Sequence, residues 1–397
     1  MKPLRQLFLE HVGQTSARPL AIEIERAEGI YLYAPDGKRY TDLISGVSVS
    51  NVGHGNPQVV DAVCEQARKY MHLMVYGEMI ESPQVLYARQ IASHLPGSLQ
   101  SVYFVNSGSE AVEGALKLAK RITGRTQLIG FENAYHGSSH GALSVMGGEF
   151  FRSAFRPLLP DVGRIRLNNA DDLQYITGRT AAVIVEPMQG EAGIVVADPE
   201  FLKALRVRCT EVGAILIFDE IQTGFGRTGY WFAFQKWDVV PDILVLAKSL
   251  GGGMPLGAFV ASAERMNALQ TDPPLGHITT FGGHPVCCAA GLAALRFLEE
   301  SGLVEQADAK GALFEALLKD HPKIQEIRRC GLMLGVEIGN ETTVQRLIAD
   351  FVANGLLPDT FLWRETAFRI APPLVITEDQ VRETAQTVRE CLDRLDH

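Results

Sequence analysis

Two short apolar segments, each ending near a charged residue, most constrain how this chain can fold. The run Ala214–Phe218 is followed directly by Asp219, and the run Ile243–Leu246 is followed after one alanine by Lys248. Unalternating apolar runs of this length are typical of strands buried on both faces of a parallel sheet. Because the carboxyl ends of parallel strands share one edge, where ligands bind, we expect Asp219 and Lys248 to reach one crevice.

The residues after Lys248 favour a chemical role for its amine. Taken alone, a charge at the end of a strand is more often simply solvated. Here Lys248 precedes a glycine-dense turn, Ser249–Gly257, which lets the main chain approach a ligand closely. An amine held there and partly removed from water can have its pKa lowered and can attack a carbonyl carbon.

The middle of the chain alternates between short apolar strands and helical segments. Further strands are predicted at residues 101–105, 127–131, 181–185 and 258–261. A helix with Ala111, Ala115, Leu118 and Ala119 on one face follows the first of them. This alternation predicts an α/β protein, in which a mostly parallel mixed sheet is covered by helices on both faces.

The two ends of the chain have a different pattern. Residues 30–33 and 39–43 flank the turn Pro35-Asp36-Gly37, which predicts an antiparallel hairpin. The last third combines helical patterns with a strand-like segment at 335–338. We therefore expect a smaller α+β domain made from both termini. The predicted division is 1–46 for its N-terminal part, 47–288 for the large domain and 289–397 for its C-terminal part.

A phosphate site is predicted where the strand at 101–105 gives way to a helix. Ser107 and Glu110 have the spacing of a capping box, and Gly108 leaves the first amides of the helix uncovered. The N-terminus of a helix favours a phosphate group. An ordinary helix cap accounts for this segment equally well when its neighbours are ignored.

Composition excludes several classes of function. The net charge of −9 argues against a nucleic-acid-binding protein with a global basic face. Six cysteines without a C-x-x-C pair indicate reduced thiols, and the ten histidines show no metal-ligand spacing. His136, like the others, is therefore expected to be an isolated packed or surface residue. With no 18-residue apolar span, we expect a cytoplasmic enzyme without a membrane segment or metal.

These residues converge on one kind of cofactor. An aldehyde that carries a phosphate needs a lysine, an acid for a pyridine nitrogen, an aromatic face and a phosphate cup. In this combination the chain resembles, over residues 46–377, the class III aminotransferases of fold type I, which depend on pyridoxal 5'-phosphate (PLP). The resemblance implies that Lys248 forms the Schiff base, Asp219 pairs with the ring nitrogen and Gln222 lies near the ring hydroxyl. It also implies that Tyr135 stacks on the ring and that Gly108 and Ser109 bind the phosphate.

The same resemblance implies a set of substrate-binding residues and a shared site. Arg369, in Phe368-Arg369-Ile370-Ala371-Pro372-Pro373, matches the arginine that grips a substrate carboxylate, and Glu191 matches the acid that can pair with it. Thr280 matches a threonine that binds the phosphate of the partner subunit, which implies a homodimer or larger assembly with shared active sites. Thr279 and Val47 are assigned to the substrate side. Here His284 replaces the family's usual asparagine.

One departure leaves the substrate open. Where members acting on acetylornithine, ornithine or 4-aminobutyrate carry an arginine, this chain has Ser138, in Tyr135-His136-Gly137-Ser138. That sequence resembles amine:pyruvate transaminases, whereas Gly46-Val47-Ser48-Val49 resembles the acetylornithine type. A serine cannot replace the charge of a guanidinium, so we expect pyruvate to be favoured over 2-oxoglutarate as acceptor, unless Arg152, Arg156 or Arg364 reaches the pocket.

Two other activities are alternatives to an aminotransferase. An aminomutase can use the same scaffold and the same residues. A nicotinamide-dependent oxidoreductase is the remote alternative, because Gly251, Gly253 and Gly257 lack the spacing of the dinucleotide fingerprint and a strand, rather than a helix, is predicted after them.

Overall fold

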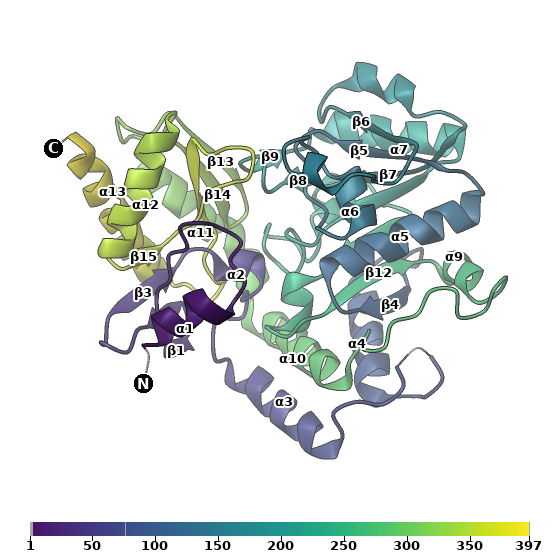
Figure 1. The fold of residues 1–397 in the computed structure, drawn as a ribbon, viewed down its shortest axis with the longest axis horizontal. Coiled ribbons are helices and arrows are strands. Elements are labelled where there is room, and N and C mark those ends of the chain that lie inside the picture. The colour runs from purple at the N-terminus through teal and green to yellow at the C-terminus, as the bar shows by residue number, and fades with distance from the viewer. Residues whose placement is uncertain (1–2, 76, 397) are drawn as a thin grey trace.

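The computed structural model describes residues 3–75 and 77–396 and consists of a larger and a smaller lobe (Figure 1). The larger lobe holds a seven-stranded sheet, in the order β4 (Ser101–Val105), β12 (Gly257–Ala261), β11 (Ile243–Leu246), β10 (Ile215–Asp219), β7 (Thr180–Val185), β5 (Gln127–Phe131), β6 (Val162–Ile165). Only β12 runs antiparallel to its neighbours. The predicted α/β class and mostly parallel mixed sheet are therefore confirmed.

Alternate residues of the central strands pack into two separate cores, one on each face of the sheet. Ile215 and Ile217 of β10 pack with apolar residues of α5 (Gly108–Thr123). Leu216 and Phe218 pack on the opposite side with the larger core, which includes α7 (Pro199–Val212). The period of two along a strand explains this split. The sheet is thus covered on both faces, and its central strands have no exposed side.

Helices α3 (Pro57–Lys69), α4 (Ser82–Ser93) and α10 (Pro285–Ser301) pack together at the side of the larger lobe (Figure 1). Shorter elements complete the two lobes and the connections between them: α1 (Leu4–His11), α2 (Ser45–Ser48), α6 (His140–Val145), α8 (Phe234–Trp237), α9 (Ala263–Met266), β8 (Met188–Gln189), β9 (Val195–Val196) and the 3₁₀ turns at Ser153–Phe155, Ala170–Tyr175, Lys248–Gly251, Asn267–Leu269 and Arg394–Asp396. None of the helices in the described residues is long and apolar enough to cross a membrane.

The smaller lobe takes residues from both ends of the chain (Figure 1). The predicted hairpin is present as β2 (Tyr31–Tyr33) and β3 (Arg39–Asp42), flanked by β1 (Arg26–Glu28). β15 (Leu356–Leu357) then pairs in parallel with β3, which joins distant parts of the sequence in one sheet. An antiparallel sheet of β13 (Glu326–Cys330), β14 (Met333–Glu337) and β16 (Ala367–Ile370), with helices α11 (Leu303–Leu318), α12 (Glu341–Ala353) and α13 (Glu378–Asp393), completes it.

One strand of the large sheet was missed by the sequence analysis. β6 at the edge of the large sheet is short and only partly buried, and its sequence, VGRI, contains a glycine and an arginine. Neither the apolar run nor the alternation that marks the other strands is present. The division of the chain at residues 46 and 288 stays a proposal, and both points fall within helices, α2 and α10.

Candidate active site

The ends of β10 and β11 lie at the same edge of the sheet because the two strands are adjacent and parallel. Asp219, the last residue of β10, is in register with Val245, three residues before Lys248. Both side chains line one cavity of about 520 Å³. The structure brings six of the predicted cofactor residues to this cavity: Gly108, Ser109, Tyr135, Asp219, Gln222 and Lys248.

Lys248 is held in a setting that favours its neutral, nucleophilic form. Its main chain has φ of +54°, an uncommon conformation for a residue with a side chain, and Ala247 alone separates it from the buried strand β11. Burial lowers the pKa of Lys248 to about 8; the positive charge of Arg369 also lowers it, whereas Glu191, Asp219 and Glu186 oppose the shift. A free amine is therefore available near neutral pH.

Asp219 is fixed by two hydrogen bonds at the end of its strand. Its Oδ2 lies 2.7 Å from His136 Nδ1, and its Oδ1 accepts a hydrogen bond from the Ile221 amide at 3.1 Å. Both Asp219 and His136 are buried, with 4% and 1% of their surface exposed. His136 was expected to be an isolated packed or surface histidine, so its contact with Asp219 was missed. The signal available in the sequence was its position directly after Tyr135.

Glu186 is a second site residue that the sequence analysis did not select. Its Oε1 accepts a hydrogen bond from the Tyr135 amide at 3.2 Å, and its Oε2 is buried without a hydrogen-bond partner among the described residues. Burial, together with the nearby charge of Asp219, raises the pKa of Glu186 well above its usual value. The cavity wall therefore carries, beside Asp219, a second carboxyl group whose charged form is disfavoured by burial.

The predicted phosphate cup lies at the N-terminus of α5. Ser107 Oγ accepts a hydrogen bond from the Glu110 amide at 3.2 Å, as expected for a cap. The Glu110 carboxylate, however, accepts from the amide and side chain of Asn106, both at 2.8 Å, and so does not complete a capping box with Ser107. Gly108 and Ser109, at the start of the helix where main-chain amides lack helical partners, line the cavity wall.

Close packing around this cup requires glycine. A Cβ on Gly137, whose φ is +123°, would lie 2.0 Å from Ser109 Oγ, and a Cβ on Gly108 would lie 2.8 Å from Ile221 Cδ1. The Ser109 hydroxyl also accepts a hydrogen bond from the Ser138 amide at 3.1 Å. Gly137 therefore allows the Tyr135 segment to approach the start of α5 closely, whereas Gly108 leaves room for Ile221.

The residues present fit PLP. The cavity combines an amine of lowered pKa, a buried acid, the half-buried Tyr135 and a helix N-terminus. Gln222 also lines it and has a buried Oε1 without a hydrogen-bond partner among the described residues, as a residue near a ring hydroxyl would. No group of three or more His, Cys, Asp or Glu side chains in the described part of the chain could hold a metal.

Arg369 and Glu191 form a buried ion pair next to this cavity. Arg369 Nη2 lies 2.7 Å from Glu191 Oε1, and only 1% of Arg369 is exposed. Gln222 Nε2 donates to the same Glu191 oxygen at 3.0 Å, which links the pair to the cavity wall. Burial alone would raise the pKa of Glu191, but Arg369 and Gln222 outweigh it and the pKa is lowered. Arg369 Nε and Nη1 are buried without partners among the described residues.

Three predicted substrate residues, Ser138, Val47 and Thr279, and the predicted cofactor residue Thr280 neither line this cavity nor join the Arg369–Glu191 pair. Ser138 is exposed and contacts Tyr135, with 3.3 Å between the two hydroxyl oxygens. Val49, rather than Val47, reaches the cavity wall. Thr279 and Thr280 lie elsewhere: Thr279 Oγ1 accepts from the Gly282 amide at 2.7 Å, and Thr280 is exposed.

The three arginines considered as replacements are also engaged away from the cavity wall. Arg364 pairs with Glu337 at 2.7 Å. Arg152 and Arg156 both pair with Glu149. None of these three arginines is among the described residues that line the cavity.

Comparison with known proteins identifies the family of this chain. The family model of class-III aminotransferases matches residues 12–392. The chain belongs to the class III aminotransferases. It is therefore a PLP-dependent transferase that moves amino groups. The nicotinamide-dependent oxidoreductase is discarded, and the strand β12 indeed begins at Gly257, where a dinucleotide fingerprint needs a helix.

The relatives and structural neighbours of this aminotransferase match it over nearly the full length. An acetylornithine aminotransferase from Methanopyrus kandleri is 40% identical over 98% of both chains. A LysW-aminoadipate semialdehyde/glutamate semialdehyde transaminase from Sulfurisphaera tokodaii is 36% identical over 93% of this chain and 94% of that protein. The structure of ornithine aminotransferase from Toxoplasma gondii, with PLP at partial occupancy in its active site, has a TM-score of 0.90 and 30% identity, and covers 99% of this chain and 94% of that one.

Proposed function

We propose that this aminotransferase moves an amino group from an amino acid or ω-amine donor of the acetylornithine, ornithine or 4-aminobutyrate kind to a 2-oxo acid, with pyruvate as the favoured acceptor. The observation that carries the acceptor choice is the cavity lining, where Lys248 is the only cationic side chain among the described residues. Amine:pyruvate transamination, which the Tyr135–Ser138 segment favours, is the second candidate. An aminomutase on the same scaffold would lack net transfer to an added acceptor.

In this proposal, the cavity residues divide the chemistry between them. Bound PLP supplies a carbonyl carbon that condenses with amines and a ring that accepts electrons from the substrate carbon. Lys248 Nζ would hold the cofactor, and as a free amine it would move the proton at the substrate carbon. Asp219 keeps a proton on the ring nitrogen, and His136 holds the Asp219 carboxylate in place.

The substrate side carries one carboxylate anchor. Arg369 presents a planar guanidinium that suits bidentate binding of a carboxylate, and Glu191 neutralises it when the incoming amine has none nearby. A second carboxylate, such as that of 2-oxoglutarate, has only Ser138 where relatives would offer an arginine. A charge-assisted hydrogen bond is worth about 1.5–3 kcal/mol, hence roughly ten- to a hundredfold in specificity.

The acceptor choice is tested by measuring kcat/KM for pyruvate and 2-oxoglutarate with one common donor. We expect a clear preference for pyruvate, and we expect Ser138→Arg to raise kcat/KM for 2-oxoglutarate. A preference of the unmodified enzyme for 2-oxoglutarate would contradict the acceptor proposal. Absence of transfer to either acceptor, with an isomerised donor as product, would instead establish an aminomutase.

We also propose a cytoplasmic homodimer with two shared active sites. Two segments, 71–80 and 275–281, carry exposed apolar side chains, and the second segment contains the exposed Thr280. The exposed apolar residues include Met71, Met74, Met79, Ile80, Leu275 and Phe281. An isologous two-fold contact would cover both segments and offer Thr280 to the partner's phosphate cup. All six cysteines are free thiols, in keeping with a reducing compartment. Monomers in sedimentation that are fully active at the assay concentration would contradict the dimer.

A further inference from the structure

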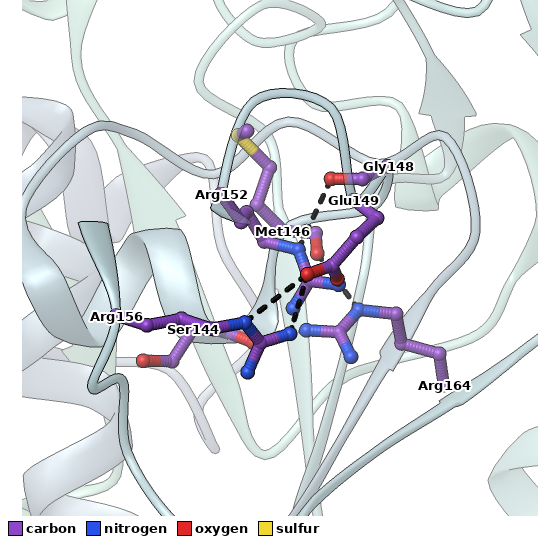
Figure 2. Close-up of polar contacts among 7 residues, drawn as sticks. All are labelled: Ser144, Met146, Gly148, Glu149, Arg152, Arg156 and Arg164. Carbon is purple, nitrogen blue, oxygen red and sulfur yellow. Dashed lines mark hydrogen bonds and ion pairs between the residues drawn. The ribbon is translucent and has the colours of Figure 1, made fainter. Parts of the chain in front are cut away.

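Three arginines lie near a single carboxylate, that of Glu149 in the loop between α6 and β6, and two of them pair with it (Figure 2). Arg152 Nη2 lies 2.7 Å from Glu149 Oε2, and Arg156 Nε lies 3.1 Å from Glu149 Oε1. Arg164, on β6, forms no ion pair with any described residue and instead donates to the Met146 carbonyl at 2.9 Å and to the Ser144 carbonyl. We call Arg152, Arg156 and Arg164 the arginine cluster.

The arginine cluster is not neutralised by its surroundings. Its three positive charges face one negative charge in a chain whose net charge is −9. By contrast, Arg166 pairs with Asp172, and Arg329 pairs with both Asp308 and Glu315. Burial, reinforced by the charges of Arg152 and Arg156, lowers the pKa of Arg164 to about 10 despite Glu149. An added anion would relieve this imbalance.

The cluster also has donors to offer. No hydrogen bond is made by Nη1 of any of the three guanidinium groups to the described residues. Arg152 is 6% exposed and is held in place by the Gly148 carbonyl at 3.1 Å. The Arg156 and Glu149 side chains are 57% and 55% exposed, so a ligand has access. A fixed, buried arginine beside an accessible one is a preorganised binder of oxyanions.

The loop that carries the arginine cluster contacts two parts of the active site, the Tyr135 segment and, through Trp363, the Glu191 segment. The Gly147 amide donates to the Ala134 carbonyl at 2.8 Å, next to Tyr135 of the cavity wall. A Cβ on Gly148 would lie 2.4 Å from Trp363 Nε1. The Trp363 amide in turn donates to the Glu191 carbonyl at 3.1 Å. An anion bound at the cluster would therefore sit near both the cofactor side and the Arg369–Glu191 pair.

We propose that the arginine cluster is an oxyanion-binding site that takes a phosphate or carboxylate group, either of a free anion or of the far end of an extended substrate. The ligand oxygens accept hydrogen bonds from the Nη1 groups of the arginine cluster. The negative charge of the ligand adds to, or replaces, that of Glu149 as the partner of these arginines. For an extended substrate the inference rests on the proposed function, because the anion is then part of the amino donor or acceptor. For a free anion it is independent of that function.

The experiment is isothermal titration calorimetry of the PLP-loaded enzyme, in which the cofactor fills the phosphate cup. Inorganic phosphate and glutarate serve as probes at constant ionic strength. We expect Arg156→Gln to weaken binding by about tenfold, because it removes one charge-assisted contact. The matched control is Arg166→Gln, since the Arg166 side chain is 60% exposed and paired one-to-one with Asp172. We expect Glu149→Gln to tighten binding by removing the competing carboxylate.

Two results would overturn the proposal: no uptake of either probe by the unmodified enzyme, or equal weakening by Arg156→Gln and Arg166→Gln. Steady-state kinetics with added phosphate then distinguish the sources. Inhibition that is competitive with the amino donor or the acceptor identifies the ligand as part of a substrate. An unchanged KM, with binding still lost in Arg156→Gln, identifies a free anion. Failure of the proposed function would appear as absent transfer to pyruvate, which leaves the calorimetry unaffected.

Discussion

The cofactor side and the substrate side of the cavity are built in different ways. On the cofactor side, Asp219 and Lys248 follow neighbouring parallel strands, and the sheet register fixes their separation. On the substrate side, Arg369 on β16 of the smaller lobe meets Glu191 of a loop 178 residues away in the sequence. The first arrangement depends on main-chain hydrogen bonds, whereas the second depends on one ion pair. Changes on the cofactor side should therefore affect every substrate, and changes on the substrate side should discriminate among substrates.

The largest effect is expected for Lys248→Ala. Turnover should be lost with every donor, because no other amine lines the cavity in the described residues, while the cofactor should still bind through Gly108, Ser109 and Asp219. Turnover assays and cofactor retention after gel filtration measure the two properties separately. Turnover at the level of the unmodified enzyme would disprove the role of Lys248.

Asp219→Asn should lower kcat by several orders of magnitude for all donors alike, because an amide cannot keep the ring nitrogen protonated. The protein should stay folded and coloured, since Asn is nearly the same size and can still contact His136. Single-turnover kinetics with two unlike donors provide the check. Near-normal rates, or a large loss with only one donor, would break the distinction between the two sides.

The pH dependence of cofactor attachment should report the lowered pKa of Lys248. Only the neutral amine attacks the carbonyl carbon, so below pH about 8 the rate should fall tenfold per unit, and above it the rate should level off. A lysine with the ordinary pKa of about 10.4 would react roughly a hundredfold more slowly at pH 8. Stopped-flow absorbance after mixing apoenzyme with PLP measures the profile. A midpoint near 10 would mean that burial does not act on Lys248 as described.

The smallest effect, and the most selective, is expected for Glu191→Gln. The change removes the negative charge next to Arg369, so donors with an α-carboxylate should bind about tenfold more tightly, while ω-amines without a nearby carboxylate should not gain. The measurement is kcat/KM for one donor of each kind. Equal changes for both donors would show that Glu191 serves the cavity structure rather than substrate choice.

Adjacent residues show how far sequence reasoning reaches. Asp219 and Glu220 are both acids at the end of one strand, yet they point to different places. Asp219 lines the cavity, whereas Glu220 accepts hydrogen bonds from the Phe234 and Ala233 amides and from Thr223, and burial raises its pKa to about 7. The alternation of side chains along a strand separates the two, but the sequence does not say which face carries the cavity.

The sequence by itself determined the strand-and-helix alternation, the glycine turn after Lys248 and the cofactor family, because these depend on local patterns of apolar residues and on short motifs. Only the tertiary structure decided that His136 holds Asp219, that Glu186 is buried beside it, that Val49 rather than Val47 reaches the cavity and that Arg152 and Arg156 share Glu149 next to Arg164. Each of these contacts joins segments distant in sequence or chooses one face of a turn. Burial and charge then depend on what packing brings together, and no local pattern records that.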